Sequence, residues 1–120
     1  MKNGGINIMN KYYQIDKSPY HLNNYFIKAT EEVHKQFINF AKPKHFSYQM
    51  IIINLFGLEP KDFFSYIQYK YKAKIIKPKT ATGWKSIVFE NIVDANNFAN
   101  ECERRFAYCI DNKIFERMIQ

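Results

Sequence analysis

The feature that most constrains the fold is a nine-residue alternation of apolar and polar side chains between Ile67 and Ile75. Every residue at an even position in this run is a glutamine or a lysine. The odd positions hold Ile67, Tyr69, Tyr71, Ala73 and Ile75. Such alternation is typical of a β-strand that buries one face and exposes the other. It predicts a strand whose tyrosines point inward and whose lysines point outward, closed by Pro78.

A turn and a second strand complete a predicted β-hairpin. Residues 79–83 form the turn, and Trp84–Glu90 returns as the partner strand. Six lysines and no acidic residue lie between Phe63 and Phe89, in a chain whose net charge is +7. A localised basic surface favours a polyanionic partner, and nucleic acid is the commonest one. Outward lysines also protect exposed strand edges against aggregation, so a purely structural role stays open.

Upstream of the hairpin, Gly57 separates two short segments. The first, Tyr48–Phe56, contains the β-branched run Ile51–Ile53, which favours a strand by propensity. The following residues favour helices, because Gly57 can take the positive φ of a helix C-cap and Pro60 suits the first turn of another helix. The second helix is then predicted to run from about Pro60 to Ile67, where the alternation begins.

Apolar residues surround Gly57 at regular distances, five and one before it and one, six and nine after it. These residues are Ile52, Phe56, Leu58, Phe63 and Tyr66. With the turn glycine and the hairpin, the stretch Ser47–Phe89 resembles a winged helix-turn-helix. Two positions depart from that pattern: Ile53 stands where a small residue is usual, and Glu59 replaces a better N-cap. The resemblance implies a DNA-binding α+β fold of three or four helices with one β-hairpin.

The resemblance also implies which residues contact DNA. In a helix-turn-helix the second helix enters the major groove, and its exposed positions here would include Lys61, Ser65 and Gln68. Gln68 could bind an adenine edge, and Lys61 a guanine or a phosphate. Asp62 would be repelled by phosphates and could accept only from a cytosine amine. The hairpin would act as a wing whose lysines bind phosphate, and these are Lys70, Lys72, Lys74, Lys77, Lys79 and Lys85.

The N-terminal third predicts a strand and then helix. Residues 1–10 are expected to be a flexible tail, and Lys11–Asp16 a short strand. Ser18 and Pro19 form a good helix start, followed by an apolar stripe at helical spacing. The stripe predicts either one long helix or a break before Thr30, and it consists of Leu22, Phe26, Ala29, Val33, Phe37 and Phe40.

The C-terminal third predicts a helix capped by Asp94. Lys113–Ile119 follows as a last turn or short helix. Cys102 and Cys109 lie two helical turns apart, too far for a disulfide, and are expected to be reduced core thiols. The apolar stripe of the helix consists of Ala95, Phe98, Cys102, Phe106, Cys109 and Ile110.

No catalytic or cofactor-binding pattern is present in the sequence. The three histidines share no metal-ligand spacing, and the four glycines are too scattered for a phosphate loop. The neighbours Glu101 and Glu103 are expected to be solvated on exposed helix faces. No apolar run reaches the 18 residues that would indicate a membrane span. We therefore expect a cytoplasmic, non-enzymatic protein without metal, cofactor or membrane contact.

Together these features predict one α+β, winged-helix-like domain over residues 11–120 that binds double-stranded DNA. It would act as a regulator or replication accessory factor, with a mobile element as one origin. A homodimer or a protein partner would use the C-terminal helices. One alternative is a split β-α-β-β-α domain that binds RNA or single strands by stacking bases on Tyr69 and Tyr71. Another is a small adaptor or inhibitor that binds another protein and no nucleic acid.

Overall fold

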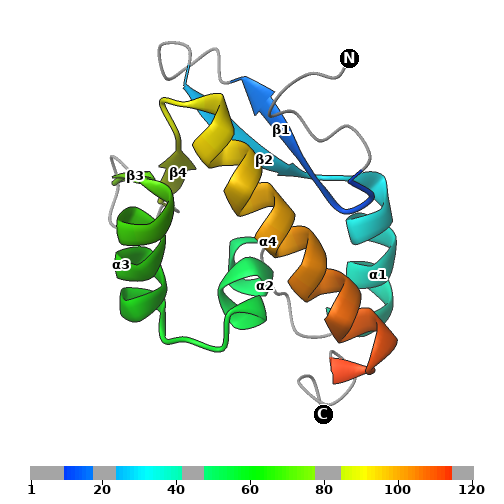
Figure 1. Cartoon of the computed structure of the whole chain (residues 1–120). Coiled ribbons are helices and arrows are strands. Elements are labelled where there is room, and N and C mark those ends of the chain that lie inside the picture. The colour runs from blue at the N-terminus through cyan, green and yellow to red at the C-terminus, as the bar shows by residue number, and fades with distance from the viewer. Residues whose placement is uncertain (1–9, 18–23, 42–47, 78–84, 115–120) are drawn as a thin grey trace.

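Strands and helices follow one another in an α+β order along the chain (Figure 1). The computed structural model describes residues 10–17, 24–41, 48–77 and 85–114. Four helices and two small antiparallel hairpins lie within these residues. The elements are β1 (Tyr13–Lys17), β2 (Tyr25–Ala29), α1 (Glu31–Ala41), α2 (Tyr48–Leu55), α3 (Pro60–Tyr71), β3 (Lys74–Ile76), β4 (Ser86–Val88) and α4 (Ile92–Asp111). The predicted α+β class is confirmed, with two hairpins where one was expected.

Helix α4 runs across the centre of the molecule, with α3 and the β3–β4 hairpin on one side and α1, β1 and β2 on the other (Figure 1). Its apolar stripe is buried as predicted, although Ile110 is only partly buried. At the middle of the core, Phe98 is 1% exposed. Its ring centroid lies 5.5–6.4 Å from those of four other aromatic rings, which belong to Phe56, Phe63, Tyr71 and Phe89.

The start of α4 differs from the prediction. The N-cap is Asn91, whose side chain accepts hydrogen bonds from the backbone N–H groups of Val93 and Asp94. Asp94 therefore lies inside the first turn, where its negative charge is favourable near the helix N-terminus. Both cysteines are free and buried, as predicted.

The segment Tyr25–Ala29 is a strand, and its prediction as helix is wrong. It pairs antiparallel with β1, so that Tyr13 faces Ala29 and Lys17 faces Tyr25. Aromatic and β-branched residues suit a strand, and a partner strand satisfies the backbone groups that a helix would satisfy internally. Of the two alternatives for this stretch, one long helix is wrong and a break before Thr30 agrees with the structure, because α1 begins at Glu31. The predicted helix start at residues 18 and 19 lies outside the described residues.

The two hairpins meet at a single β-bridge. The backbone N–H of Tyr25 donates to the carbonyl of Phe89 and that of Phe89 to the carbonyl of Tyr25, both at 2.8 Å. The bridge joins β2 to the end of β4. It therefore ties the N-terminal hairpin to the basic one across the top of α4 (Figure 1).

Helix α3 continues through most of the alternating run, and the predicted strand from Ile67 is wrong. The helix ends at Tyr71, and β3 covers only Lys74–Ile76. Ile67 and Tyr71 are four residues apart, so they share one face of a helix just as they share one face of a strand. Tyr69 distinguishes the helix from the strand, because in a helix it lies on the face opposite to Ile67 and Tyr71. Its 90% exposure agrees with the helix.

Helix α2 forms despite its β-branched run, which resolves the alternative left by the sequence. Ile51 and Ile53 are both 4% exposed, and burying them in the core outweighs their preference for a strand. Gly57 has a φ of +66°, as predicted for the C-cap, and its N–H donates to the carbonyl of Asn54. Pro60 occupies the first turn of α3, and the side chain of Glu59 makes no capping bond.

Glu103 holds the segment before β1 against α4. Its carboxylate accepts backbone N–H bonds from Lys11 (2.9 Å), Tyr12 (2.8 Å) and Tyr13 (3.0 Å). The predicted solvated position for this side chain is therefore wrong. These bonds join two parts of the chain about ninety residues apart.

Replacing Glu103 with glutamine should lower the free energy of unfolding by about 1–3 kcal/mol. The neutral amide keeps one acceptor oxygen, so at least one of the three bonds is lost and the others weaken. Urea unfolding followed by circular dichroism measures the change. The matched control is Glu59→Gln, which removes a carboxylate without a capping bond and should change stability by less than about 0.5 kcal/mol. Equal effects of the two variants would contradict the assigned role of Glu103.

Candidate nucleic-acid interface

The outer face of α3 gathers the residues predicted to contact bases. Lys61, Ser65 and Gln68 are all exposed, and their spacing places them on one face of the helix. Because α3 is longer than predicted, Tyr69 and Lys72 extend the same exposed face to the C-terminal end of the helix. The opposite face is buried and holds Phe63, Ile67 and Tyr71.

One lysine of the hairpin reaches this face directly. The Nζ atom of Lys85 lies 4.5 Å from the centre of the Phe64 ring. On the helix surface Phe64 neighbours Lys61 three residues before it and Gln68 four residues after it. Gln49 of α2 fixes the position of Lys85, since its side-chain amide donates to the Lys85 carbonyl at 2.7 Å. Lys85, Lys61 and Gln68 therefore belong to one surface.

Two predicted phosphate-binding lysines have carboxylate partners. The Nζ atom of Lys70 donates to the Tyr66 hydroxyl at 2.9 Å and lies 3.8 Å from a Glu101 oxygen. The bond to Tyr66 and then the charge of Glu101 raise the pKa of Lys70. Lys74 pairs with Glu90 at 2.7 Å, and this bond lowers the pKa of Glu90. The exposed Lys74–Glu90 pair contributes little to stability. In both pairs the carboxylate competes with phosphate for the ammonium.

The remaining predicted residues divide between exposed and undescribed positions. Lys77 is exposed directly after β3, and Lys72 is exposed at the end of α3. Lys79 and the hairpin turn lie outside the described residues. Asp62 is exposed in the first turn of α3, next to Lys61. The basic surface therefore carries one carboxylate at its N-terminal edge.

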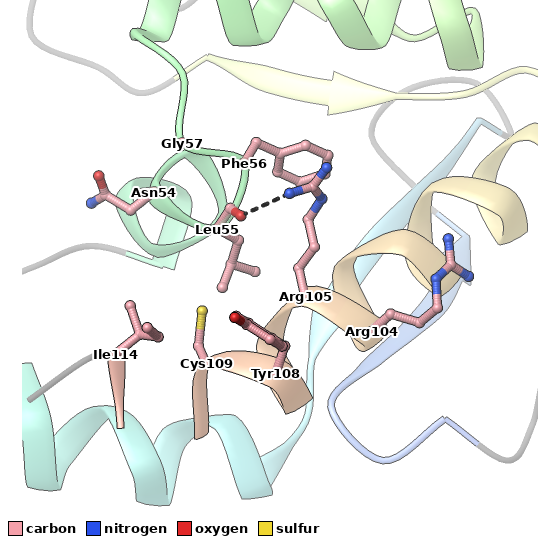
Figure 2. Close-up of a pocket in the computed structure, with 9 residues that line it drawn as sticks. All are labelled: Asn54, Leu55, Phe56, Gly57, Arg104, Arg105, Tyr108, Cys109 and Ile114. Carbon is pink, nitrogen blue, oxygen red and sulfur yellow. Dashed lines mark hydrogen bonds between the residues drawn. The ribbon is translucent and has the colours of Figure 1, made fainter. Parts of the chain in front are cut away.

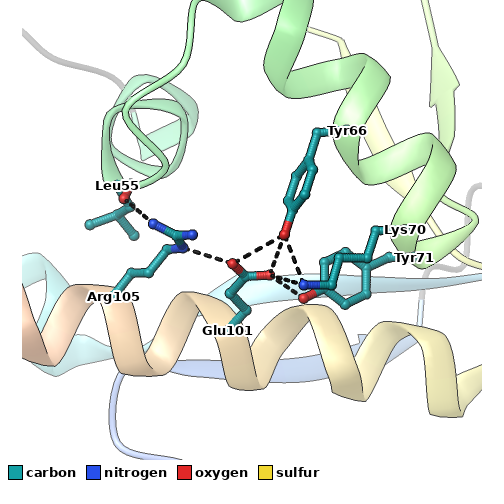
Figure 3. Close-up of polar contacts among 6 residues, drawn as sticks. All are labelled: Leu55, Tyr66, Lys70, Tyr71, Glu101 and Arg105. Carbon is teal, nitrogen blue, oxygen red and sulfur yellow. Dashed lines mark hydrogen bonds and ion pairs between the residues drawn. The ribbon is translucent and has the colours of Figure 1, made fainter.

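The sequence prediction missed a buried polar network centred on Glu101 (Figure 3). This carboxylate is 6% exposed, and its expected solvated position is wrong. It accepts from the hydroxyls of Tyr71 and Tyr66, the latter at 3.3 Å, and from Nε of Arg105 at 2.8 Å. The spacing of Glu101 and Arg105, four residues apart beside a buried cysteine, is the one signal in the sequence that indicates such a pair.

Arg105 extends the network to the end of α2. Its Nη1 donates to the carbonyl of Leu55 at 3.3 Å, and its guanidinium carbon lies 4.5 Å from the centre of the Phe56 ring. Leu55 is the last residue of α2, where helix carbonyls lack partners within the helix. Glu101 and Arg105 thus fasten both α2 and α3 to α4, and so hold the outer face of α3 in place.

The charge state of the network follows from its contacts. Burial alone would raise the pKa of Glu101, but the hydrogen bonds from Tyr71 and Arg105 and the charges of Arg105 and Lys70 outweigh it. The pKa of Glu101 therefore lies below its ordinary value. Burial, and then the bond to Glu101, raise the pKa of Tyr71 well above its ordinary value. At neutral pH the carboxylate is charged and the Tyr71 hydroxyl keeps its proton.

A groove of about 380 Å³ lies between the end of α2 and the C-terminal half of α4 (Figure 2). Its thiol, Cys109, is mostly buried, and this burial raises its pKa, which disfavours the reactive thiolate. Among the described residues, no group of three or more His, Cys, Asp or Glu side chains is placed to hold a metal ion. The groove is lined by Asn54, Leu55, Phe56, Gly57, Arg104, Arg105, Tyr108, Cys109 and Ile114.

The alternative of a domain that binds RNA or single strands requires Tyr69 and Tyr71 to lie together on a β-sheet, and they do not. Tyr69 and Tyr71 both lie on α3, and Tyr71 is 6% exposed and bonded to Glu101. Tyr71 therefore has no face on which a base could stack. The observed order β-β-α-α-α-β-β-α also differs from a split β-α-β-β-α unit.

No family model matches the chain, and no curated protein or solved structure matches it significantly. No helix in the described part of the chain is long and apolar enough to cross a membrane.

Proposed function

We propose that the protein binds double-stranded DNA, with α3 in the major groove and the β3–β4 hairpin beside it as a wing. The observation that carries this proposal is the position of Lys85 from the hairpin over the ring of Phe64, which neighbours Lys61 and Gln68 on the surface of α3. A regulator or a replication accessory factor would use such a surface. In this proposal α2, the Gly57 turn and α3 act as the helical pair of a winged helix-turn-helix.

The dimensions and position of α3 support the proposal. A helix of 12 residues is about 18 Å long, and the major groove is wide enough to admit it. Helix α3 lies at the edge of the molecule (Figure 1). Its buried face is fastened through Tyr71 and Tyr66 to Glu101, so the exposed face is held rigidly. Rigid presentation reduces the entropy lost on binding.

The distribution of charge supports the same surface. No acidic residue lies between Phe63 and Phe89, and exposed lysines there release counterions when they contact phosphates. Gln68 can bind an adenine through two hydrogen bonds, and Asp62 can accept from a cytosine amine. The proposed base contacts therefore run along the outer face of α3 from Asp62 to Gln68, and the proposed phosphate contacts are made by Lys61 and the lysines of the hairpin.

Changing Lys61 and Lys85 together to alanine should weaken duplex binding on the order of tenfold or more, because two charged hydrogen bonds to phosphate are lost. The slope of log affinity against log salt should fall by about 2, one for each phosphate contact. Fluorescence anisotropy with a labelled random-sequence duplex, titrated across a salt series, measures both quantities.

The matched control changes Lys28 and Lys35, which are exposed on β2 and α1, and it removes the same charge. Its slope should stay within error of the wild-type slope. Equal losses in the two double variants would mean that net charge, and not the α3 surface, binds DNA. Absence of duplex binding at about 50 mM salt would overturn the proposal. Tighter binding to single-stranded DNA or RNA would favour the alternative ligand.

A further inference from the structure

The C-terminal turn of α3 exposes an aromatic side chain that packing does not explain. Tyr69 is 90% exposed, whereas the other exposed large apolar side chains among the described residues reach 38% at Leu58, 49% at Val93 and 62% at Tyr108. The side chains of Tyr69 and Lys72 make no hydrogen bond or ion pair with another residue of the described segments. The backbone N–H of Lys72 donates to the Ile67 carbonyl at the end of the helix. Tyrosine is enriched at binding interfaces, where its ring supplies apolar contact area.

The residue that ends α3 has an unfavourable backbone conformation. Lys72 has a φ of 56° and a ψ of 35°, in the left-handed region where glycine is preferred at a helix end. Lys113, after α4, has a φ of 55° and is the other non-glycine residue with positive φ in the described segments. A lysine at position 72 therefore makes the folded protein less stable than a glycine there would. It also places a positive charge three residues from Tyr69.

Tyr69 and Lys72 lie together at the proposed edge of the DNA contact. Three residues of separation make them neighbours on the exposed helix face. The N-terminal half of a recognition helix enters the groove, so its C-terminal end emerges beside the sugar–phosphate backbone. The nearest acidic residue on this face is Asp62, which lies about 10 Å from Tyr69 and about 15 Å from Lys72 along the helix. The pair therefore combines an apolar ring with an unpaired ammonium where a backbone strand would pass.

We propose that Tyr69 and Lys72 clamp one strand of duplex DNA, with the tyrosine ring against a deoxyribose and the ammonium on the adjacent phosphate. This inference rests on the proposed function and adds Tyr69 to its contacts. Backbone contacts of this type set the register of the protein on the duplex without reading sequence. The conformational strain at Lys72 is then the cost of placing a cation at the helix end.

Replacing Lys72 with glycine should raise the melting temperature by a few degrees and weaken DNA binding. The salt-dependence slope should fall by about 1, as expected for one lost phosphate contact. The control is Lys113→Gly, which relieves the same backbone conformation at the end of α4. It should raise the melting temperature without changing the binding of a labelled random-sequence duplex. A variant that is more stable and binds less tightly excludes unfolding as the cause.

Replacing Tyr69 with alanine should weaken duplex binding by about tenfold with an unchanged salt slope, since an apolar contact releases no counterions. Tyr69→Phe should bind like the wild type, because the ring makes the contact. Loss of binding in Tyr69→Phe would overturn the sugar contact. If Lys61→Ala with Lys85→Ala weakens binding while the Tyr69 and Lys72 variants do not, the clamp is wrong and the proposed function stands. If the wild type fails to bind duplex, both are wrong.

Discussion

Replacing Phe98 with alanine is expected to lower the free energy of unfolding by about 3–5 kcal/mol. Phe98 is 1% exposed and lies among aromatic rings from α3 and from the residues directly after α2 and β4. Truncation removes the apolar contacts of the ring and leaves a cavity, and rigid aromatic neighbours collapse poorly into such a space. Because small proteins are stable by about 5–15 kcal/mol, much of the total would be lost.

Urea unfolding followed by far-UV circular dichroism measures the effect of Phe98→Ala. Phe98→Leu, which keeps most of the volume, should cost less than about 1.5 kcal/mol. Tyr108→Ala, on an exposed position of the same helix, should change stability by less than about 0.5 kcal/mol. A loss below about 1 kcal/mol for Phe98→Ala would mean that α4 does not form the centre of the core.

Replacing Glu101 with glutamine is expected to destabilise the protein by about 2–3 kcal/mol at neutral pH. Breaking a fully buried ion pair typically costs about 3–5 kcal/mol. The side chain of Arg105 is 40% exposed, so water partly compensates its lost partner. The amide also weakens the acceptor of the Tyr71 hydroxyl, whose burial leaves it few other partners. The loss should loosen α3 as well, because Tyr66 and Tyr71 bind the same carboxylate.

The pH dependence of stability identifies the Glu101 contribution. The pKa of Glu101 in the folded protein lies below its ordinary value of 4.5. The unfolded chain therefore takes up a proton first as the pH falls. The stabilisation is present above the unfolded pKa and is lost progressively as the pH falls through the folded pKa. Urea midpoints measured from about pH 7 down to about pH 3 should fall less steeply in Glu101→Gln than in the wild type.

Two further measurements test this assignment. Glu59→Gln, which alters a carboxylate without a capping bond, should keep the wild-type pH dependence. Glu101→Gln should also bind duplex DNA less tightly while keeping the salt-dependence slope, since it removes no phosphate contact. A wild-type pH dependence in Glu101→Gln would show that another carboxylate governs acid stability.

The predicted parts of the fold were those whose signals are local. The buried stripe of α4 was predicted because six apolar residues repeat at helical spacing in a helix that packs along one face. The Gly57 turn was predicted because glycine tolerates positive φ at little cost. Of the candidate site, the exposure of Lys61, Ser65 and Gln68 followed from helical geometry alone. Of the predicted wing lysines, Lys70 and Lys72 lie on and at the end of α3, which is a different element from the one predicted. Lys74 lies on β3 as predicted, and Lys77 and Lys85 lie beside the strands of the hairpin.

The failures have one physical origin, which is that a short pattern satisfies two structures. Ile67 and Tyr71 match a strand and a helix equally, and only Tyr69 distinguishes them. Phe26 and Ala29 likewise have helical spacing, but they lie in a strand because the segment pairs with β1. A pattern read within a short stretch of sequence does not include this pairing partner. The N-cap of α4 was misplaced by three residues, because Asn91 and Asp94 are both suitable caps.

The sequence by itself determined the basic, acid-free segment, the glycine turn and the apolar stripe of α4, because composition, backbone freedom and helical period belong to single residues or their near neighbours. Tertiary structure decided that Tyr25–Ala29 is a strand and that α3 extends to Tyr71. It also decided that Glu101 is buried. That carboxylate is stable inside the protein because, beside the local partner Arg105, α3 supplies hydroxyl donors from 30 and 35 residues away, and no local pattern contains these two donors.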